Sequence, residues 1–201
     1  MIKTASNLIC EFPKEYAQPY HRLLLMEKKG EIFSLKRGLY ETDKNADPLS
    51  LAAAIVGSSY VSFQTALSYY DLIPERTPTI MSATFSLHKS KQFVNAFGTF
   101  VYQDIPSKAY PLGTLFIESQ GRKIEIASPE KALCDTLSQA RPLKDEKELE
   151  EWLYSFMRME ETDIFSLDSR SILEWVPLYK KRNVHLLGSY LKGRKKHGQQ
   201  T

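Results

Sequence analysis

The segment from Lys28 to Tyr40, which reads KKGEIFSLKRGLY, places the tightest constraint on how this chain can fold. A charged helix end gives way to Gly30, and glycine is the residue that most readily takes the left-handed conformation of a helix C-terminus. Ile32, Phe33 and Leu35 are apolar and favour a strand, and a basic turn at 36–38 leads into a second strand. Helix, glycine, strand, basic turn and strand is the order of a winged helix, whose helix enters a DNA groove while the hairpin lays cations along the phosphates. An ordinary helix followed by a β-hairpin with a solvated turn would leave the same pattern.

Charge is distributed unevenly along the chain. Residues 1–40 hold seven Lys and Arg against four acids, whereas residues 41–179 hold thirteen against twenty. Residues 180–201 hold seven basic residues and no acid. Two basic ends around an acidic middle predict a polyanionic partner at the ends, because summed charge governs partners and association rates rather than fold.

Composition favours a globular protein. A chain of 201 residues with 42% hydrophobic and 25% charged residues can bury a core, as one large domain or two small ones. No apolar run approaches the roughly 20 residues of a membrane span, and the first ten residues lack the apolar region of a signal peptide. Cys10 and Cys134 provide neither a disulfide framework nor a metal cluster. We therefore expect a bacterial-type cytoplasmic protein with two reduced thiols.

The predicted elements change from helices to strands and back. Ser128-Pro129-Glu130 is the clearest helix start, since it combines an N-cap hydroxyl, a proline at the first helical position and an acid in the first turn. Helices are expected at 2–10, 18–29, 49–56, 60–72 with Ser62 as N-cap, 128–137, 145–158, 168–176 and 183–191. Beyond the N-terminal hairpin, strands are expected at 79–85, 98–104, 115–119 and 123–127. Segregated strands predict an α+β fold with a small sheet of about four strands and flanking helices.

Motifs for catalysis are missing from the sequence. It has no Walker loop, no GxGxxG, no HExxH, no GxSxG and no CxxC, and its four histidines are scattered. A magnesium-dependent nuclease that uses Asp104, Glu118 and Lys123 is an alternative, since clustered acids with a lysine can hold the metal and stabilise a leaving phosphate. Charged residues around a hairpin turn are more often structural. We therefore expect no enzyme activity, no cofactor and no metal.

Four blocks of the sequence together resemble a known family. They are KGEIFSLKRGLY (29–40), SYVSFQTALSYYDLIPE (59–75), KSKQFVNAFGTFVYQDIP (89–106) and IASPEKALCDTL (126–137). Their order and spacing are similar to those of the AbiEi family of antitoxins, the regulatory halves of abortive-infection toxin–antitoxin pairs that serve in bacterial phage defence. The blocks cover most of residues 20–137.

The resemblance implies a DNA-binding transcriptional repressor of its own operon, which also counteracts a nucleotidyltransferase-type toxin without enzymatic activity. Its partners would be operator DNA and the toxin, with a homodimer on the DNA as a further expectation. The implied domains are a winged helix at 1–45, an antitoxin domain at 46–191 and a basic flexible tail at 192–201. Only nineteen residues precede Tyr20, so the winged helix should be reduced.

The expected DNA-binding residues fall into three groups. One lies on or beside the predicted reading helix, one forms the hairpin tip and one lies in the tail: His21, Arg22, Lys28 and Lys29; Lys36 and Arg37; Lys192, Arg194, Lys195 and Lys196. Phosphate contacts would supply affinity, and Arg22 is the first candidate for reading base edges. A protein-interaction module that has lost DNA binding is the main alternative to this hypothesis.

Overall fold

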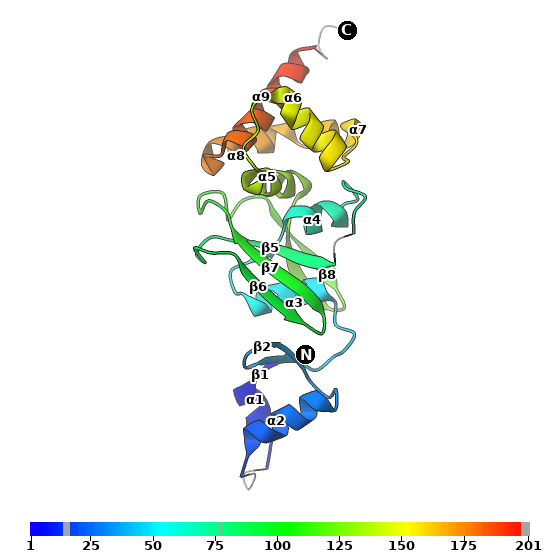
Figure 1. The fold of residues 1–201 in the computed structure, drawn as a ribbon, viewed down its shortest axis with the longest axis vertical. Coiled ribbons are helices and arrows are strands. Elements are labelled where there is room, and N and C mark those ends of the chain that lie inside the picture. The colour runs from blue at the N-terminus through cyan, green and yellow to red at the C-terminus, as the bar shows by residue number, and fades with distance from the viewer. Residues whose placement is uncertain (14–16, 77, 198–201) are drawn as a thin grey trace.

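The chain folds into an α+β structure in which two sheets with their own helices follow one another along an elongated molecule (Figure 1). The computed structural model describes residues 1–13, 17–76 and 78–197. The predicted fold class is confirmed at this level, whereas the predicted size of the second sheet is wrong, as described below.

In chain order, helices and strands are mixed up to residue 69, strands follow up to residue 127, and helices make up the rest of the described chain. The helices are α1 (Ala5–Cys10), α2 (Pro19–Lys28), α3 (Pro48–Ile55), α4 (Phe63–Tyr69), α5 (Pro129–Gln139), α6 (Glu146–Glu150), the π-helix η1 (Glu151–Phe156), α7 (Glu161–Ser166), α8 (Ser169–Tyr179) and α9 (Arg182–His197). The strands are β1 (Ile2–Thr4), β2 (Phe33–Lys36), β3 (Leu39–Glu41), β4 (Tyr60–Val61), β5 (Thr79–Thr84), β6 (Lys91–Asn95), β7 (Gly98–Asp104), β8 (Thr114–Ser119) and β9 (Arg122–Ala127).

The first sheet is small, and α1 and α2 pack on it. In the described part of the chain it has three antiparallel strands in the order β1-β3-β2. Leu8, Leu23 and Ile32 form its buried centre, separate from the main core. The predicted helix at 2–10 is correct only from Ala5, where Thr4 caps α1. Residues 2–4 instead pair with β3, a partner so distant in sequence that local periodicity gives no sign of it.

The second sheet has six strands among the described residues, in the order β6-β7-β5-β4-β9-β8. The pairs β5–β7 and β4–β9 are parallel, and the remaining neighbours are antiparallel. The four predicted strands are present, and β4 and β6 are additional. Strand β4 was not predicted because two residues carry no period, and β6 was not predicted because this edge strand is largely exposed and polar.

Helices cover both faces of the second sheet. The Tyr102 hydroxyl of β7 donates to the Ala52 carbonyl of α3 (2.7 Å), which places α3 on one face. Neighbouring residues of a strand point to opposite faces, and Gln103 accordingly lies beside α4 and α5. Helices α8 and α9 pack on the outer side of α5 and complete the C-terminal end (Figure 1).

The C-terminal helices differ from their predictions in three details. The expected helix at 145–158 consists of α6 followed by the π-helix η1, and α7 was not predicted. The last helix continues six residues beyond Leu191, to His197. Within the described residues, no helix is both long and apolar enough to cross a membrane.

Candidate nucleic-acid interface

Helix α2, the predicted reading helix, carries an exposed apolar surface. Leu23 is buried against the N-terminal core, and Met26 is half-buried. The other apolar residues of the helix face outward, with exposed fractions of 68% for Tyr20, 56% for Leu24 and 40% for Leu25. Tyr20, Leu24 and Leu25 are therefore not packed on the core of the N-terminal residues.

The cations of α2 do not all face the same way. His21, Lys28 and Lys29 are exposed, as a contact with DNA requires. Arg22 is half-buried, and its guanidinium lies 5.0 Å from the centroid of the Phe12 ring, just after α1. Arg22, the first candidate for base reading, therefore packs against its own domain.

The hairpin between β2 and β3 presents one of its two predicted cations. Arg37 is exposed at the turn, where Gly38 has a φ of +77° that favours glycine. The Lys36 ammonium instead donates to the carbonyl of Ile55, the last residue of α3. Lysine at a helix C-terminus satisfies a free carbonyl and interacts favourably with the helix dipole. Lys36 therefore joins the two halves of the molecule, and this bond holds its ammonium at the end of α3.

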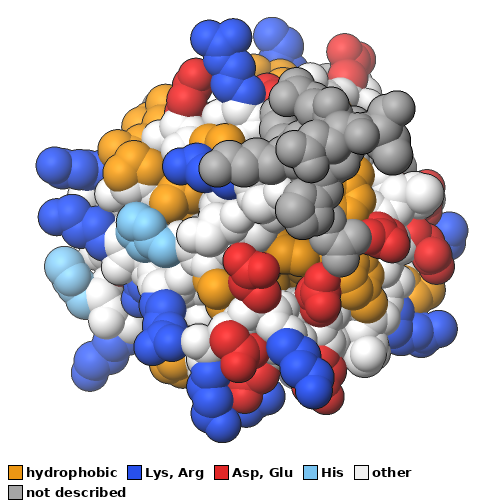
Figure 2. All heavy atoms as spheres, turned by 90° about the horizontal axis from the view of Figure 1, so that it is seen from above, with side chains coloured by type: hydrophobic (Ala, Val, Ile, Leu, Met, Phe, Trp, Pro, Cys, Tyr) orange, Lys and Arg blue, Asp and Glu red, His pale blue; other side chains and the backbone are white. Residues whose placement is uncertain are grey.

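The predicted tail cations lie at the other end of the molecule. Lys192 is exposed on α9, and the side chains of Arg194, Lys195 and Lys196 lie outside the described residues. Figure 1 shows α9 and α2 at opposite ends, with the larger sheet between them. Figure 2, a view onto the C-terminal end, shows Lys and Arg along one side and acids among hydrophobic side chains on another. The structure does not bring the two basic ends together.

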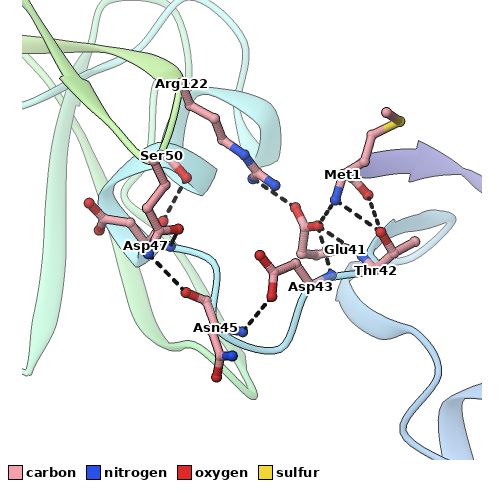
Figure 3. A network of polar contacts seen from close by, with 9 residues as sticks. Met1, Glu41, Thr42, Asp43, Asn45, Asp47, Ser50 and Arg122 are labelled. Atoms are coloured by element: carbon pink, nitrogen blue, oxygen red, sulfur yellow. Dashed lines mark hydrogen bonds and ion pairs between the residues drawn. The ribbon is translucent and has the colours of Figure 1, made fainter.

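A polar network holds the N-terminal sheet against the larger one (Figure 3). The fully buried Glu41 of β3 forms an ion pair with Arg122 of β9 (Nη1–Oε2, 2.8 Å) and another with the Met1 amine. It also accepts from the backbone N–H of Thr42 (2.9 Å) and of Asp43 (3.0 Å). Burial alone would raise the pKa of Glu41, but the bonds from Arg122, the amine and the backbone lower it from 4.5 to about 2.

Three further hydrogen bonds cross the same junction. The Gln120 side chain accepts from the Asp47 N–H (3.1 Å) and donates to the Asn45 carbonyl (3.2 Å). On the opposite side, the Asn95 amide of β6 donates to the Leu35 carbonyl of β2 (3.1 Å). The hairpin that was expected to lie along DNA is therefore fixed to the rest of the protein at both margins.

A buried cluster of charged and hydroxyl-bearing side chains around α5 was not predicted from the sequence. Lys131 and Asp135 are fully buried, with Nζ and Oδ1 3.1 Å apart. The lysine also donates to the Ala109 carbonyl (2.8 Å) and the Tyr179 hydroxyl (2.7 Å). Asp135 accepts from the hydroxyls of three residues: Tyr60 (2.9 Å), Ser62 (2.7 Å) and Tyr179 (2.5 Å). Burial lowers the pKa of Lys131 although Asp135 opposes the shift, and burial raises the pKa of both tyrosines.

This cluster connects α5 to β4 and α8. Each of its side chains is buried, so it has no open path to a substrate, and we assign it a structural role. The only sequence signal was the lysine–aspartate pair at i and i+4 in SPEKALCDTL, a spacing that is common on exposed helix surfaces.

The three residues suggested for a magnesium-dependent nuclease, Asp104, Glu118 and Lys123, do not come together in one site. Asp104 of β7 accepts from the backbone N–H of Leu87 (3.1 Å) and His88 (2.7 Å). Glu118 of β8 is paired with Lys123 of β9, and β5, β4 and β9 lie between β7 and β8. Nowhere in the described residues do three or more His, Cys, Asp or Glu side chains gather as metal ligands would. The constellation of Asp104, Glu118 and Lys123 is therefore not formed.

Comparison of the sequence with protein-family models and with curated proteins found no match.

Proposed function

We propose that the protein is a DNA-binding regulator that serves as the antitoxin of an abortive-infection toxin–antitoxin pair, the function that the resemblance to the AbiEi family implies. In this proposal the N-terminal sheet and its two helices bind the operator and repress transcription. The larger sheet and the C-terminal helices counteract a nucleotidyltransferase-type toxin.

The arrangement of the N-terminal residues carries this proposal. The order β1-α1-α2-β2-β3, with β3 between β1 and β2 in the sheet, is that of a winged helix without the helix that precedes its first strand. In this proposal α2 is the recognition helix, and its position at the free end of the molecule supports that role (Figure 1). A helix that enters the major groove needs such an uncovered face.

The exposure of the individual side chains indicates which of them could contact phosphates and which could contact bases. His21, Lys28, Lys29 and Arg37 are exposed around α2 and the hairpin, so they can reach phosphates. Base reading would fall to the exposed N-terminal half of α2, at Tyr20, His21 and Leu24. Apolar side chains can read the methyl group of thymine, and this allows Leu24 a role on DNA.

A protein-interaction module without DNA binding is the second candidate, and the exposed Tyr20, Leu24 and Leu25 favour it. Apolar side chains that gather on one helix face are typical of surfaces that bind proteins. The two candidates predict different effects of the double substitution Leu24→Ser/Leu25→Ser. A module should lose its partner and never show DNA binding. A regulator should keep the salt-dependent affinity that its exposed cations supply and lose only part of its preference for the operator.

The test of the proposal is binding of the purified protein to the DNA upstream of its gene, measured by fluorescence anisotropy against a scrambled duplex. We expect a preference for the upstream DNA of about 10³-fold or more at physiological salt, the lower end of specific binding. Equal affinity for the two duplexes at every salt concentration would refute operator recognition. Growth rescue on co-expression with a neighbouring nucleotidyltransferase-like gene tests the antitoxin role separately.

A further inference from the structure

Strand β8 forms an unprotected edge of the larger sheet. Among the described residues its only strand neighbour is β9, and the register between the two runs from Thr114 to Ser119 without a bulge. The strand contains no proline and one charged residue, Glu118. Two of its apolar side chains face solvent, with exposed fractions of 49% for Leu115 and 71% for Phe116. Proteins normally protect edge strands with charges, prolines or bulges, because a free edge pairs readily with another strand.

The opposite edge of the same sheet, β6, is protected. It begins with the exposed Lys91, and β2 of the N-terminal sheet lies against it. The Asn95 amide of β6 donates to the Leu35 carbonyl of β2 (3.1 Å). By contrast, within the described chain no hydrogen bond from outside the β8–β9 pair reaches the backbone of residues 114–119. The free edge is therefore particular to β8.

The turn after β8 determines which backbone groups of the strand point outward. Gln120 and Gly121 have φ values of 51° and 71°, as in the two-residue type I′ turn that joins antiparallel strands. Ser119 and Arg122 flank this turn and lie opposite each other in the register. The residues that flank such a turn form its closing hydrogen-bonded pair.

From that closing pair, hydrogen-bonded and non-hydrogen-bonded pairs alternate along the two strands. The bond from the Ser128 N–H to the Gly113 carbonyl (2.7 Å), six residues before the turn, agrees with this alternation. The residues of β8 that do not bond β9 direct their N–H and C=O groups away from it. They are Thr114, Phe116 and Glu118.

We propose that β8 pairs with β8 of a second copy of this chain, antiparallel, about a two-fold axis that passes through Phe116 perpendicular to the sheet. In this register every outward-pointing N–H and C=O group of the strand finds a partner. Phe116 exchanges two bonds with its own counterpart, and Thr114 exchanges two with Glu118 of the partner subunit. The dimer uses neither α2 nor the basic hairpin and needs no DNA, so this inference is independent of the proposed function.

The side chains of β8 match this register. Leu115 lies opposite Ile117, so two partly exposed aliphatic side chains meet on one face of the sheet, and the two Phe116 rings meet on the other. Apolar and aromatic pairs across neighbouring strands stabilise a sheet. Thr114 lies opposite Glu118, whose carboxylate can accept from the threonine hydroxyl. The strand is therefore complementary to itself.

The neighbouring registers fit less well. Only shifts of two residues keep each face of the joined sheet continuous. A shift toward the turn would place Glu118 against Phe116 and Thr114 against Gln120, which lies in the turn. The opposite shift would place Glu118 against Leu112, which precedes the strand. A second copy therefore fits this edge in one register.

Analytical ultracentrifugation of the full chain without DNA tests the proposal. An interface of one strand pair is small, so we expect a monomer–dimer equilibrium with a Kd on the order of 10 µM, the weak end of specific association. Phe116→Glu should weaken the dimer about tenfold or more, since it removes the central aromatic pair and places two carboxylates opposite each other. Val94→Glu is the matched control, because Val94 is 72% exposed but lies on β6, and it should leave the Kd unchanged.

A charge exchange separates a lost contact from a damaged fold. An equimolar mixture of Phe116→Glu and Phe116→Lys should form a heterodimer more tightly than either variant associates with itself, because opposite charges then face each other across the axis. A damaged fold would not be restored by mixing.

Cysteine substitution measures the register. The background is Cys10→Ser, since Cys10 is exposed whereas Cys134 is buried. Phe116→Cys should give a covalent dimer on mild oxidation, because Cα atoms of a hydrogen-bonded pair lie about 5.5 Å apart, within reach of a disulfide. Glu118→Cys, on the same face of the strand, should stay uncoupled, because its counterparts are offset by about 13 Å along the strands.

Three outcomes would overturn the proposal. One is a chain that stays monomeric at about 1 mM, a concentration beyond the affinities of weak specific complexes; the edge would then be left to a strand of a different protein. Another is a dimer that Phe116→Glu leaves intact. The last is cross-linking of Glu118→Cys as fast as that of Phe116→Cys.

Discussion

Gly113 occupies a position that no other residue fits well. Its φ is +69°, and a Cβ built there would lie 2.5 Å from the indole of Trp175 and 3.1 Å from Cβ of Lys131. Gly113→Ala should therefore combine left-handed strain with overpacking and lower the free energy of unfolding by about 2–4 kcal/mol. Urea unfolding measures this loss.

Gly121 is the matched control, because its φ is +71° and nothing lies within 4 Å of its Cβ position. Gly121→Ala should cost only the strain, about 1–2 kcal/mol. Equal losses in the two alanine variants would show that Trp175 moves aside freely and that the close approach is unimportant.

Glu41 makes the stability of the protein depend on acid pH. Its pKa is about 2 in the folded protein and 4.5 ordinarily, so its contribution is complete above pH 4.5 and disappears as the pH falls toward 2. Unfolding free energies measured across this window should fall less steeply in Glu41→Gln than in the unaltered protein. Glu31→Gln, which removes an exposed carboxylate near the same sheet, should keep the original slope. Identical slopes for all three proteins would contradict a depressed pKa at Glu41.

At the scale of single elements, α5 depends on a charge pair inside the core. Lys131→Met leaves Asp135 buried without its cation and should cost about 3–5 kcal/mol, and Asp135→Leu should cost a similar amount. The double variant should lose clearly less than the sum, since it leaves neither charge unpaired. Chemical denaturation of the four proteins completes this cycle. Additive losses would mean that the two charges are stabilised independently of each other, by the Ala109 carbonyl and the neighbouring hydroxyl groups.

The same helix shows how far local sequence predicts structure. Its start at Ser128-Pro129 was predicted and is confirmed, because a cap and a first-turn proline act within a few residues. The burial of Lys131 was missed, since it depends on Tyr179 and on the carbonyl of Ala109, both distant in sequence. Ser62 was predicted as an N-cap and occupies that position, but its hydroxyl donates to Asp135 instead of capping the helix.

In the candidate DNA interface, too, features set by neighbouring residues were predicted and features set by tertiary contacts were not. Helix α2 and the hairpin were predicted at nearly the correct residues, because Gly30 and the basic turn are local signals. The directions of Arg22 and Lys36 depend on Phe12 and on the end of α3, which are tertiary contacts. The pattern along the chain identified which residues are cationic but did not indicate which of them reach solvent.

At the scale of the whole molecule, the basic ends are separated by the acidic middle. Residues 41–179, with thirteen basic residues against twenty acids, lie between α2 and α9 along the elongated structure (Figure 1). The expectation that both ends act on the same stretch of DNA therefore needs revision. A duplex of about 15 base pairs bound at α2 should not gain from the cations of α9.

This separation gives distinct salt dependences for four variants that bind such a duplex. Each phosphate contact contributes about 0.9 to the slope of log affinity against log salt concentration. Arg37→Ala should therefore lower the slope by about 0.9, and Lys28→Ala/Lys29→Ala by nearly twice as much. Lys36→Ala should leave the slope unchanged and lower the melting temperature, because its ammonium bonds the end of α3. Truncation after Leu191 should change neither the slope nor the preference for the upstream sequence. If Lys36→Ala flattens the slope as much as Arg37→Ala, both hairpin cations contact phosphate.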